Sequence, residues 1–480
     1  MEMAWGQLIN GSWRKGRSTD RITAVDPATE EVLNEFHAAS TADTEDAIAA
    51  AIAGFRGWRA TPGWVRADVL HKCADTMVAL AEEAARQITL EAGKPLAQAR
   101  REWQLSVDQF RWYAEEARRI HGRITESRAP GGRIEVYHEP IGVVAAFTAW
   151  NFPAVLIARK VAPALAAGCS IIVRPSRETP GTAAVLMDCL VQAGVPEGVV
   201  NLVVGPTSTT YDVLMKSPHV RKVSLTGSSS VGQQMLRDAA QTFKRATMEL
   251  GGNAPVIIFD DASLDATLDI CVPVKFANAG QVCVTGDRFF VHESLYSKFV
   301  DGFAARAKTL KLGHGLDETT QMGPLINAKR VAAIETIVAD ARKRGGRIAA
   351  GGERPSDKNK GFFYSPTVIA DLPDDALALA KENFGPVAAI TSFRTDEEVY
   401  ARANATDLGL SAYAFTQSAK RMRETVSRLE AGMVGINSFA LAAAEAPFGG
   451  IKASGMGREG GDEGIHDYLN VKLAQMTVWR

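Results

Sequence analysis

The sequence is poor in cysteine, with only five in 480 residues: Cys73, Cys169, Cys189, Cys271 and Cys283. They lie far apart and form no CxxC pair. A sparse, odd-numbered set of this kind is neither a disulfide framework nor a structural zinc site. We therefore expect no metal site, and a cysteine that has a role here acts as a thiol.

Neither sign of charge is in surplus, and no long apolar run is present. Lys and Arg number 54 and Asp and Glu number 55, so the formal net charge is −1. That balance argues against a nucleic acid or an anionic membrane surface as a partner. Arg159 and Lys160 interrupt the apolar stretch 141–173, which therefore does not predict a membrane span. The start, MEMAWGQLINGSW, lacks a basic segment followed by an apolar core, so we expect no secretory signal and a cytoplasmic protein.

The order of the patterns predicts an α/β protein. Residues 43–120 carry apolar positions at helical spacing, with Thr41 or Asp43 as the first cap. Further along, short β-rich runs alternate with helical segments, which predicts βαβ units around a parallel sheet. The alternation resumes after Gly251–Gly252 and predicts a second α/β body. The last run, 468–479, alternates with no partner near it in sequence, so we expect an edge strand that pairs with another subunit.

Two side chains are candidates for chemistry. Cys283, in FANAGQVCVTGDRFFV, follows a Gly-Gln turn that could expose its thiol, although most lone cysteines are inert and buried. The nearest histidine, His292, is nine residues further on, and nothing local indicates a Cys–His pair. Glu249, in TMELGGN, is either a solvated turn residue or a carboxylate that the glycines allow close to a reaction centre.

Three strand-to-helix turns are candidates for ligand binding. LTGSSSVGQQ, at 225–234, could bind an anion at a helix N-terminus, although Gly-Ser turns cap many helices. Arg174 and Arg177, in VRPSRETP, follow a predicted parallel strand, where α/β sheets bind ligands; the alternative is a solvated basic turn. Trp150 and Asn151, in TAWNFP, follow another strand, and the Asn amide could either stabilise an oxyanion or cap a helix.

Taken together, these segments resemble the aldehyde dehydrogenase superfamily. The matches are TAWNFP, ELGGN, NAGQVC, GPLIN, ENFGPV and PFGGIKASGMGREGG, in one order over nearly the whole chain. Among subfamilies the chain is most similar to the succinic and α-ketoglutaric semialdehyde dehydrogenases. The resemblance implies a Rossmann-like dinucleotide-binding domain over 1–120 and 141–252. It also implies an α/β catalytic domain over 253–455 and a small β oligomerisation arm over 121–140 and 456–480.

The resemblance also implies roles for individual residues. Cys283 matches the nucleophile, Glu249 the general base, Asn151 an oxyanion donor and Lys160 a lysine near the site. The implied cofactor contacts are Thr148, Trp150, Arg174, Ser176, Arg177, Gly227, Ser228, Val231, Gly251, Glu382 and Phe384. The implied substrate contacts are Phe152, Arg159, Val282, Val284 and Phe448.

Two departures from the family pattern concern the cofactor. The family usually has Lys where this chain has Arg174, and members that prefer NAD usually have Glu where it has Arg177. That Glu repels the 2′-phosphate of NADP, whereas a guanidinium binds phosphate well. We therefore expect NADP as the preferred cofactor, or use of both NADP and NAD.

Other departures concern the substrate. Succinic semialdehyde enzymes have an Arg where this chain has Ala277, and a Ser near EAPFGG where it reads ALAAAEAPF. The small side chains of Ala277, Ala440 and Ala442 predict a wide opening to the substrate pocket. Such an opening suits a bulkier aliphatic or aromatic aldehyde or a longer semialdehyde. Arg159 is kept, and it either binds a distant acid group of the substrate or forms a structural ion pair. The position two residues after the nucleophile is Thr285, so a second cysteine for a redox switch is absent there.

The sequence leaves three readings of function. The first is oxidation of a small-molecule aldehyde to the acid through a Cys283 thioester, with succinic semialdehyde itself as an alternative substrate. The second is a cofactor-independent thiol hydrolase, which needs a histidine near Cys283. The third is a non-catalytic relative, which should have lost Cys283, Glu249 or Asn151, whereas all three are present. The resemblance and the last strand together imply a homodimer or homotetramer.

Overall fold

The computed structural model describes residues 6–478 and confirms the α/β class. Residues 1–5 and 479–480 of the predicted ranges lie outside the described residues. The predicted N-terminal helices are present as α1 (Thr41–Trp58), α2 (Gly63–Ala79), α3 (Ala81–Ala92) and α4 (Leu96–Glu116). The first cap is Ser40 rather than Thr41 or Asp43, because the Ser40 hydroxyl accepts from the Asp43 N–H while the Asp43 carboxylate accepts from the Ser40 N–H.

The first sheet has eight strands in the order β2-β1-β9-β8-β7-β10-β11-β21. Its parallel centre consists of β9 (Val200–Leu202), β8 (Ser170–Arg174), β7 (Val143–Phe147), β10 (Val220–Thr226) and β11 (Arg245–Glu249). Three short antiparallel strands flank it: β1 (Gln7–Ile9), β2 (Ser12–Arg14) and β21 (Gly455–Met456). The crossover helices are α5 (Val155–Ala167), α6 (Pro180–Gln192), α7 (Tyr211–Lys216) and α8 (Ser229–Ala240).

Helices cover both faces of the first sheet. Alternate residues of β7, such as Val144 and Ala146, pack with α2 to α6 on one face. Val143 and Ala145 pack on the other face with α1, α7 and α8. The near-continuous apolar strands follow from this double cover, since a strand buried on both sides needs apolar residues at every position.

The second sheet has seven strands in the order β14-β15-β16-β13-β12-β18-β19 and is parallel except at β14. They are β12 (Ala254–Ile258), β13 (Gly286–His292), β14 (Arg347–Ala350), β15 (Thr367–Ala370), β16 (Val387–Phe393), β18 (Ser411–Phe415) and β19 (Met433–Ile436). The helices of this half are α9 (Leu264–Phe276), α10 (Glu293–Lys308), α11 (Ala328–Lys343), α12 (Leu377–Ala380), α13 (Asp396–Asn404) and α14 (Ala419–Arg428), with a 3₁₀ turn η1 (Ala277–Gly280). The chain passes from the first sheet to the second at Gly251–Gly252, between β11 and β12.

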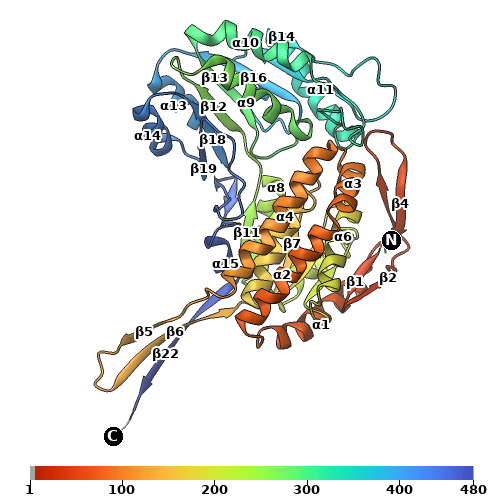
Figure 1. Cartoon of the computed structure of the whole chain (residues 1–480), viewed down its shortest axis with the longest axis vertical. Coiled ribbons are helices and arrows are strands. Elements are labelled where there is room, and N and C mark those ends of the chain that lie inside the picture. The colour runs from red at the N-terminus through yellow and green to blue at the C-terminus, as the bar shows by residue number, and fades with distance from the viewer. Residues whose placement is uncertain (1–5, 479–480) are drawn as a thin grey trace.

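A long three-stranded sheet extends away from the two α/β bodies (Figure 1). It consists of β5 (Arg123–Glu126), β6 (Gly132–Pro140) and β22 (Leu469–Thr477). β22 lies at the edge of this sheet, as expected, and pairs with the distant β6 along its whole length. Its pairing with another subunit stays a prediction. β22 joins this sheet only at Leu469; before it, β21 pairs with β11 and α15 (Glu463–His466) contacts α5.

Two further two-stranded sheets complete the described structure: β3 (Arg21–Val25) with β4 (Val32–His37), and β17 (Leu408–Gly409) with β20 (Ile451–Lys452). Within residues 6–478, no helix combines the length and apolar character needed to cross a bilayer. The predicted domain limits are not tested by the sheet assignments alone and stay predictions.

Candidate active site

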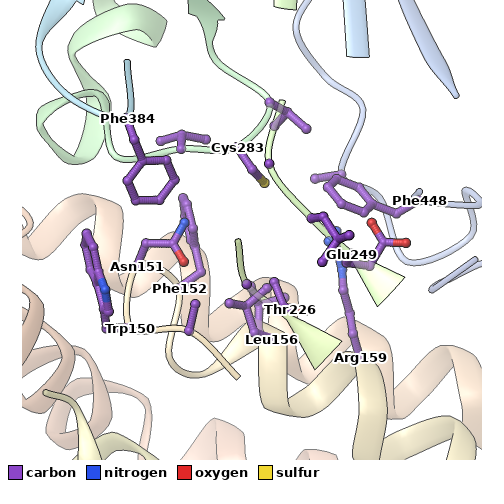
Figure 2. A pocket seen from close by; sticks show the side chains of 18 of the residues that line it. Trp150, Asn151, Phe152, Leu156, Arg159, Thr226, Glu249, Cys283, Phe384 and Phe448 are labelled. Atoms are coloured by element: carbon purple, nitrogen blue, oxygen red, sulfur yellow. The ribbon is translucent and has the colours of Figure 1, made fainter. Parts of the chain in front are cut away.

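A cavity of about 400 Å³ lies where the first sheet faces the second. Fourteen of the predicted site residues line it: Trp150, Asn151, Phe152, Arg159, Gly227, Ser228, Glu249, Gly251, Val282, Cys283, Val284, Glu382, Phe384 and Phe448. They come from segments as far apart as 150 and 448 in the sequence. The side chain of Cys283 points into this space, with Asn151 and Phe384 to one side and Glu249 and Phe448 to the other (Figure 2).

Cys283 lies in the turn between η1 and β13 and is partly buried, whereas the other four cysteines are fully buried. Its thiol packs with Leu410, Met433 and Phe448. Burial raises the pKa of the thiol to about 12, and the carboxylates of Glu382 and Glu249 add to that shift. The thiol is therefore protonated at neutral pH, and a base must take its proton before the sulfur can attack an electrophile.

Asn151 follows β7 and is held by the loop that carries Cys283. Its Nδ2 donates to the carbonyl oxygen of Gln281 at 3.1 Å. An amide nitrogen has two hydrogens, so this bond fixes the amide plane and leaves the second N–H for a ligand. The arrangement fits the oxyanion role, since a donor held in place costs no reorganisation when negative charge develops.

Glu249 ends β11 and is 3% exposed. Neither of its carboxylate oxygens has a hydrogen-bond partner among the described residues. Burial raises its pKa well above 4.5, and the nearby charge of Glu459 raises it further. A carboxylate with a raised pKa is a stronger base, as proton abstraction from water requires.

Lys160 does not line the cavity, but it reaches Glu249 through Glu459. Its Nζ donates to Glu459 Oε1 and to Ser224 Oγ, and the Ser224 hydroxyl in turn donates to the same Glu459 oxygen at 3.2 Å. The sequence predicted Lys160 as a lysine near the site but assigned it no chemical role. The structure brings it together with a carboxylate 299 positions away that sequence reasoning missed, although the motif PFGGIKASGMGREGG contains it.

Glu382 and Phe384 approach the cavity from the second sheet, just before β16. The Gly252 N–H donates to Glu382 Oε1 at 3.1 Å, and a Cβ on Gly251 would lie 2.5 Å from Glu382 Oε2. Burial raises the pKa of Glu382 to about 7, and Asp287 adds to the shift. The Phe384 ring lies edge-on to Trp150, with centroids 5.5 Å apart.

These features fit the dinucleotide that the resemblance implies. Glycine at 251 keeps the space beside Glu382 open, and Thr226 Oγ1 is a buried hydroxyl in the cavity wall with no partner among the described residues. The Ser228 hydroxyl bonds to the Ser230 hydroxyl rather than to the backbone of α8, so the first backbone N–H groups of this helix are available to an anion. The donor set offers a carboxylate for sugar hydroxyls and helix N–H groups for phosphate.

The remaining cofactor candidates lie outside the cavity wall, along the edges of β7, β8 and α8. Arg174 is half-buried and donates to the Gly205 carbonyl at 3.3 Å; burial lowers its pKa, as does the nearby Arg177. Arg177 is exposed, and the Ser176 hydroxyl donates to Glu178. Thr148 is buried with an unpartnered hydroxyl, and Val231 is 48% exposed on α8.

Arg159 is 4% exposed and stacks on Phe448, with its guanidinium carbon 4.0 Å from the ring centroid. No carboxylate lies within ion-pair distance of it in residues 6–478, and its Nε has no hydrogen-bond partner there. The charge of Arg159 lowers the pKa of the nearby Glu249, so the substrate contact and the structural charge pair both stay predictions. Of the three alanines predicted to widen the mouth, only Ala442 lines the cavity; Ala277 lies in η1, and Ala440 lies in the loop before Ala442.

The cavity also contains residues that sequence reasoning did not single out: Leu105, Ala149, Val155, Leu156, Thr226, Leu250, Arg330 and Glu459. Three of them, Leu105, Val155 and Leu156, are apolar residues of α4 and α5, whose helical pattern gave no sign of which face meets the cavity. Arg330 follows the GPLIN motif and donates to the carbonyls of Asn383 and Phe384, both at 2.8 Å, so it holds the loop that carries Glu382.

No histidine from residues 6–478 lines the cavity. His292 is at the opposite end of β13 from Cys283 and bonds to the Ser294 hydroxyl at 2.8 Å. The thiol hydrolase reading, which needs a histidine beside Cys283, has no support in this geometry.

Comparison with known proteins gives one family. The model of the aldehyde dehydrogenase family matches residues 13–474. A succinate semialdehyde dehydrogenase of Acinetobacter baylyi is 42% identical over 97% of this chain and 96% of its own length. A 4-(hydroxymethyl)benzenesulfonate dehydrogenase of Comamonas testosteroni is 42% identical over 97% of both chains. Among solved structures, an NADP dependent enzyme of E. coli superposes with a TM-score of 0.97 at 39% identity, covering 99% of this chain and 98% of that one.

Proposed function

The chain belongs to the aldehyde dehydrogenase family, and on that premise we propose that it oxidises an aldehyde to the carboxylic acid through a thioester on Cys283, with NADP preferred over NAD. The observation that carries this proposal is the convergence of Cys283, Glu249 and Asn151 on one cavity. Each has the environment that its role requires. The thiol is exposed to the cavity, the carboxylate has a raised pKa, and the amide has a free N–H.

The first step is addition of the Cys283 sulfur to the aldehyde carbon. The thiol proton passes to solvent water, and the carbonyl oxygen becomes an oxyanion on a tetrahedral carbon. Asn151 Nδ2 and the Cys283 N–H donate to that oxyanion, and one such donor is worth roughly 3–4 kcal/mol in the transition state.

An oxidised nicotinamide, when bound, accepts the hydride that leaves the tetrahedral carbon. Cys283 then carries a thioester. Glu249 takes a proton from water, whose oxygen attacks the thioester carbon, and the acid leaves as the thiol is restored. Burial, and after it the charge of Glu459, raises the pKa of Glu249 and so strengthens this carboxylate as a base for the step.

We assign the dinucleotide to the domain over 1–120 and 141–252, with the nucleophile supplied by 253–455. Trp150, Gly227, Ser228, Gly251, Glu382 and Phe384 line the shared cavity and would hold the nicotinamide half. Arg174 ends β8 and Arg177 follows it near by, where the exposed Arg177 could meet a 2′-phosphate. Similarity to the NADP dependent enzyme of E. coli supports the same preference.

The substrate side of the cavity supports an aldehyde with an apolar body and a distant acid group. Phe152, Val282, Val284 and Phe448 supply apolar walls, and Arg159 is a buried cation that makes no direct ion pair in the described residues. Relatives act on succinate semialdehyde and on a sulfonated benzyl alcohol by name, and both substrates carry an anionic group. Succinic semialdehyde proper is the alternative, although Ala277 and the alanines before EAPFGG replace two of its usual contacts.

We also propose that the arm over 121–140 and 456–480 joins subunits into a homodimer or homotetramer. In residues 6–478, β22 has only β6 beside it, and Val471 and Leu473 expose apolar side chains on it, 70% and 66% accessible. An open apolar edge of this kind pairs readily with another strand. Size exclusion should show more than the 51.5 kDa monomer, and a monomer alone would contradict the proposal.

The decisive test is an activity panel with purified protein. Succinic semialdehyde, longer semialdehydes, and neutral aliphatic and aromatic aldehydes are each combined with NADP or NAD, and reduced nicotinamide is recorded. We expect turnover with NADP above NAD, and highest with an aldehyde that carries an acid group. No turnover with any pair would contradict the proposal.

A further inference from the structure

A buried ion pair lies behind the cavity and has no part in the steps above. Lys94 and Glu102 are each 1% exposed, and Lys94 Nζ lies 2.5 Å from Glu102 Oε2. Lys94 lies between α3 and α4, and Glu102 is in the second turn of α4. Burial of two charges costs desolvation that their attraction only partly offsets, so stability alone does not explain such a pair.

Lys94 holds the backbone of the oxyanion residue. Its Nζ donates to the Asn151 carbonyl oxygen at 2.6 Å and lies 3.9 Å from the centre of the Phe152 ring. The same carbonyl accepts a second bond from Asn278 Nδ2 at 3.0 Å. Both acceptor positions of the Asn151 carbonyl are thus occupied, which fixes the peptide plane on which its side chain stands.

Glu102 holds the other end of the same segment. Its Oε1 accepts from the Ala154 N–H at 2.8 Å and, more weakly, from the Val155 N–H at 3.4 Å, where α5 begins. Its second oxygen is the partner of Lys94. The ion pair therefore binds the backbone at Asn151, before Phe152 and Pro153, and at Ala154, after them.

The same helix face also supports the loop that carries the nucleophile. Gln98, one turn before Glu102 on α4, accepts from the Asn278 N–H at 2.8 Å. Asn278 has a left-handed backbone with φ of 49°, which is strained for a residue other than glycine, so it needs such support. Asn278 in turn donates to the Asn151 carbonyl. Helix α4 therefore holds both the segment that carries Asn151 and the loop that carries Cys283.

We propose that Lys94 and Glu102 are positioning residues for the oxyanion donor. They hold Asn151 so that the N–H left free by Gln281 points at the oxyanion. The inference rests on the proposed function, because it assigns no reaction of its own. Neither residue lines the cavity, so any effect on the chemistry passes through Asn151.

The test uses the double variant Lys94→Met/Glu102→Gln. It removes both charges together, so no unpaired buried charge remains, and the amide that replaces the Glu102 carboxylate still offers an oxygen to the Ala154 N–H. Displacement of a catalytic donor by about 1 Å lowers the rate roughly 100-fold. We expect the first-turnover burst of reduced nicotinamide to slow roughly 10- to 100-fold, while the thermal midpoint and the dissociation constant of NADP stay close to wild type.

A second readout separates positioning from general distortion of the site. Iodoacetamide alkylates Cys283 without forming an oxyanion, so its rate should match wild type in the double variant. A parallel loss of alkylation and burst would mean that the loop as a whole has moved, and would overturn the proposal. The matched control is Lys244→Met, which removes another buried lysine that donates to two backbone carbonyls, Ser217 and Val220, far from Asn151. It should leave the burst unchanged.

A double-mutant cycle gives the sharpest result. In an Asn151→Ala background, Lys94→Met/Glu102→Gln should slow the burst by less than about 2-fold, because the donor they position is gone. If the losses multiply instead, the pair acts by another route and the proposal fails. A wild-type burst that the pair variant leaves unchanged overturns this inference alone, whereas no burst in wild type overturns the proposed function and this inference with it.

Discussion

The two parallel sheets present opposite ends to the one cavity. In the first sheet, β7, β10 and β11 end there, and Asn151, Gly227 and Glu249 stand at or beyond their carboxyl ends. In the second sheet, β13 and β16 begin there, and Cys283 and Glu382 stand before their amino ends. The general rule that α/β sheets bind ligands beyond carboxyl ends therefore describes the first sheet only.

The difference assigns separate tasks to the two halves. In the proposed mechanism, the first sheet supplies the oxyanion donor and the base, and the second supplies the nucleophile and the carboxylate suited to the cofactor sugar. Variants in the two halves should therefore stop the reaction at different steps, and the expected effects below run from the largest to the smallest.

Loss of the second-sheet nucleophile should be the most severe change. Cys283→Ala removes the only thiol among the described residues that reaches the cavity, and aldehyde oxidation should fall at least about 1000-fold. Steady-state production of reduced nicotinamide measures this. Cys271→Ala is the matched control, because Cys271 is fully buried on α9 and should be dispensable. Activity retained by Cys283→Ala would refute the assignment.

Loss of the first-sheet base should stop a later step. Glu249→Gln should keep some first turnover but lower steady turnover roughly 100- to 1000-fold, because water is no longer activated. Rapid mixing with a saturating aldehyde separates the two phases. Equal steady turnover in variant and wild type would remove Glu249 from the mechanism.

At the edge of the first sheet, Arg177→Glu should change the cofactor. A carboxylate repels a 2′-phosphate that a guanidinium attracts, so the ratio of kcat/KM for NADP over NAD should fall at least about 10-fold. Arg177→Lys, which keeps the charge, is the control and should keep most of the preference. An unchanged ratio in Arg177→Glu would show that the side chain of Arg177 does not contact the 2′-phosphate.

Within the cavity, Arg159→Met should affect only acidic substrates. The buried guanidinium makes no direct ion pair in the described residues, so its removal should raise KM for aldehydes with an acid group about 10-fold and leave KM for neutral aldehydes unchanged. KM is measured for matched pairs of acidic and neutral aldehydes. A rise for both kinds would indicate a packing role against Phe448.

The smallest expected effect is a shift in pH dependence. Burial and the charge of Glu459 hold the pKa of Glu249 above 4.5, so turnover limited by this base rises with pH through that raised value. Glu459→Gln removes the neighbouring charge, which lowers the pKa of Glu249 and should move the acid limb of the kcat profile down by about one pH unit. A limb that stays in place or moves up would contradict the coupling of the two carboxylates.

The sequence predicted the parts of this site that follow local rules. The strand-to-helix turns after β7 and β8 were found from pattern alone, since their apolar runs end in polar residues. Cys283 and Glu382 stand at amino ends, where no such rule applies. The Gly-Gln turn made Cys283 a candidate, but only the ordered family motifs gave it a role and identified Glu382. Contacts between distant segments were missed, because neither partner has a local pattern. Examples are Lys160 with Glu459, Lys94 with Asn151, and β22 with β6.

The central claim is that a nucleophile from the second sheet and a base from the first act in sequence on one substrate. The most direct test is the intact mass of Glu249→Gln after incubation with an aldehyde and NADP. We predict an adduct on Cys283 with the mass of the aldehyde less two hydrogens, as a thioester requires, and none when NADP is omitted. An unmodified protein, or an adduct of the full aldehyde mass that forms without NADP, would contradict the claim.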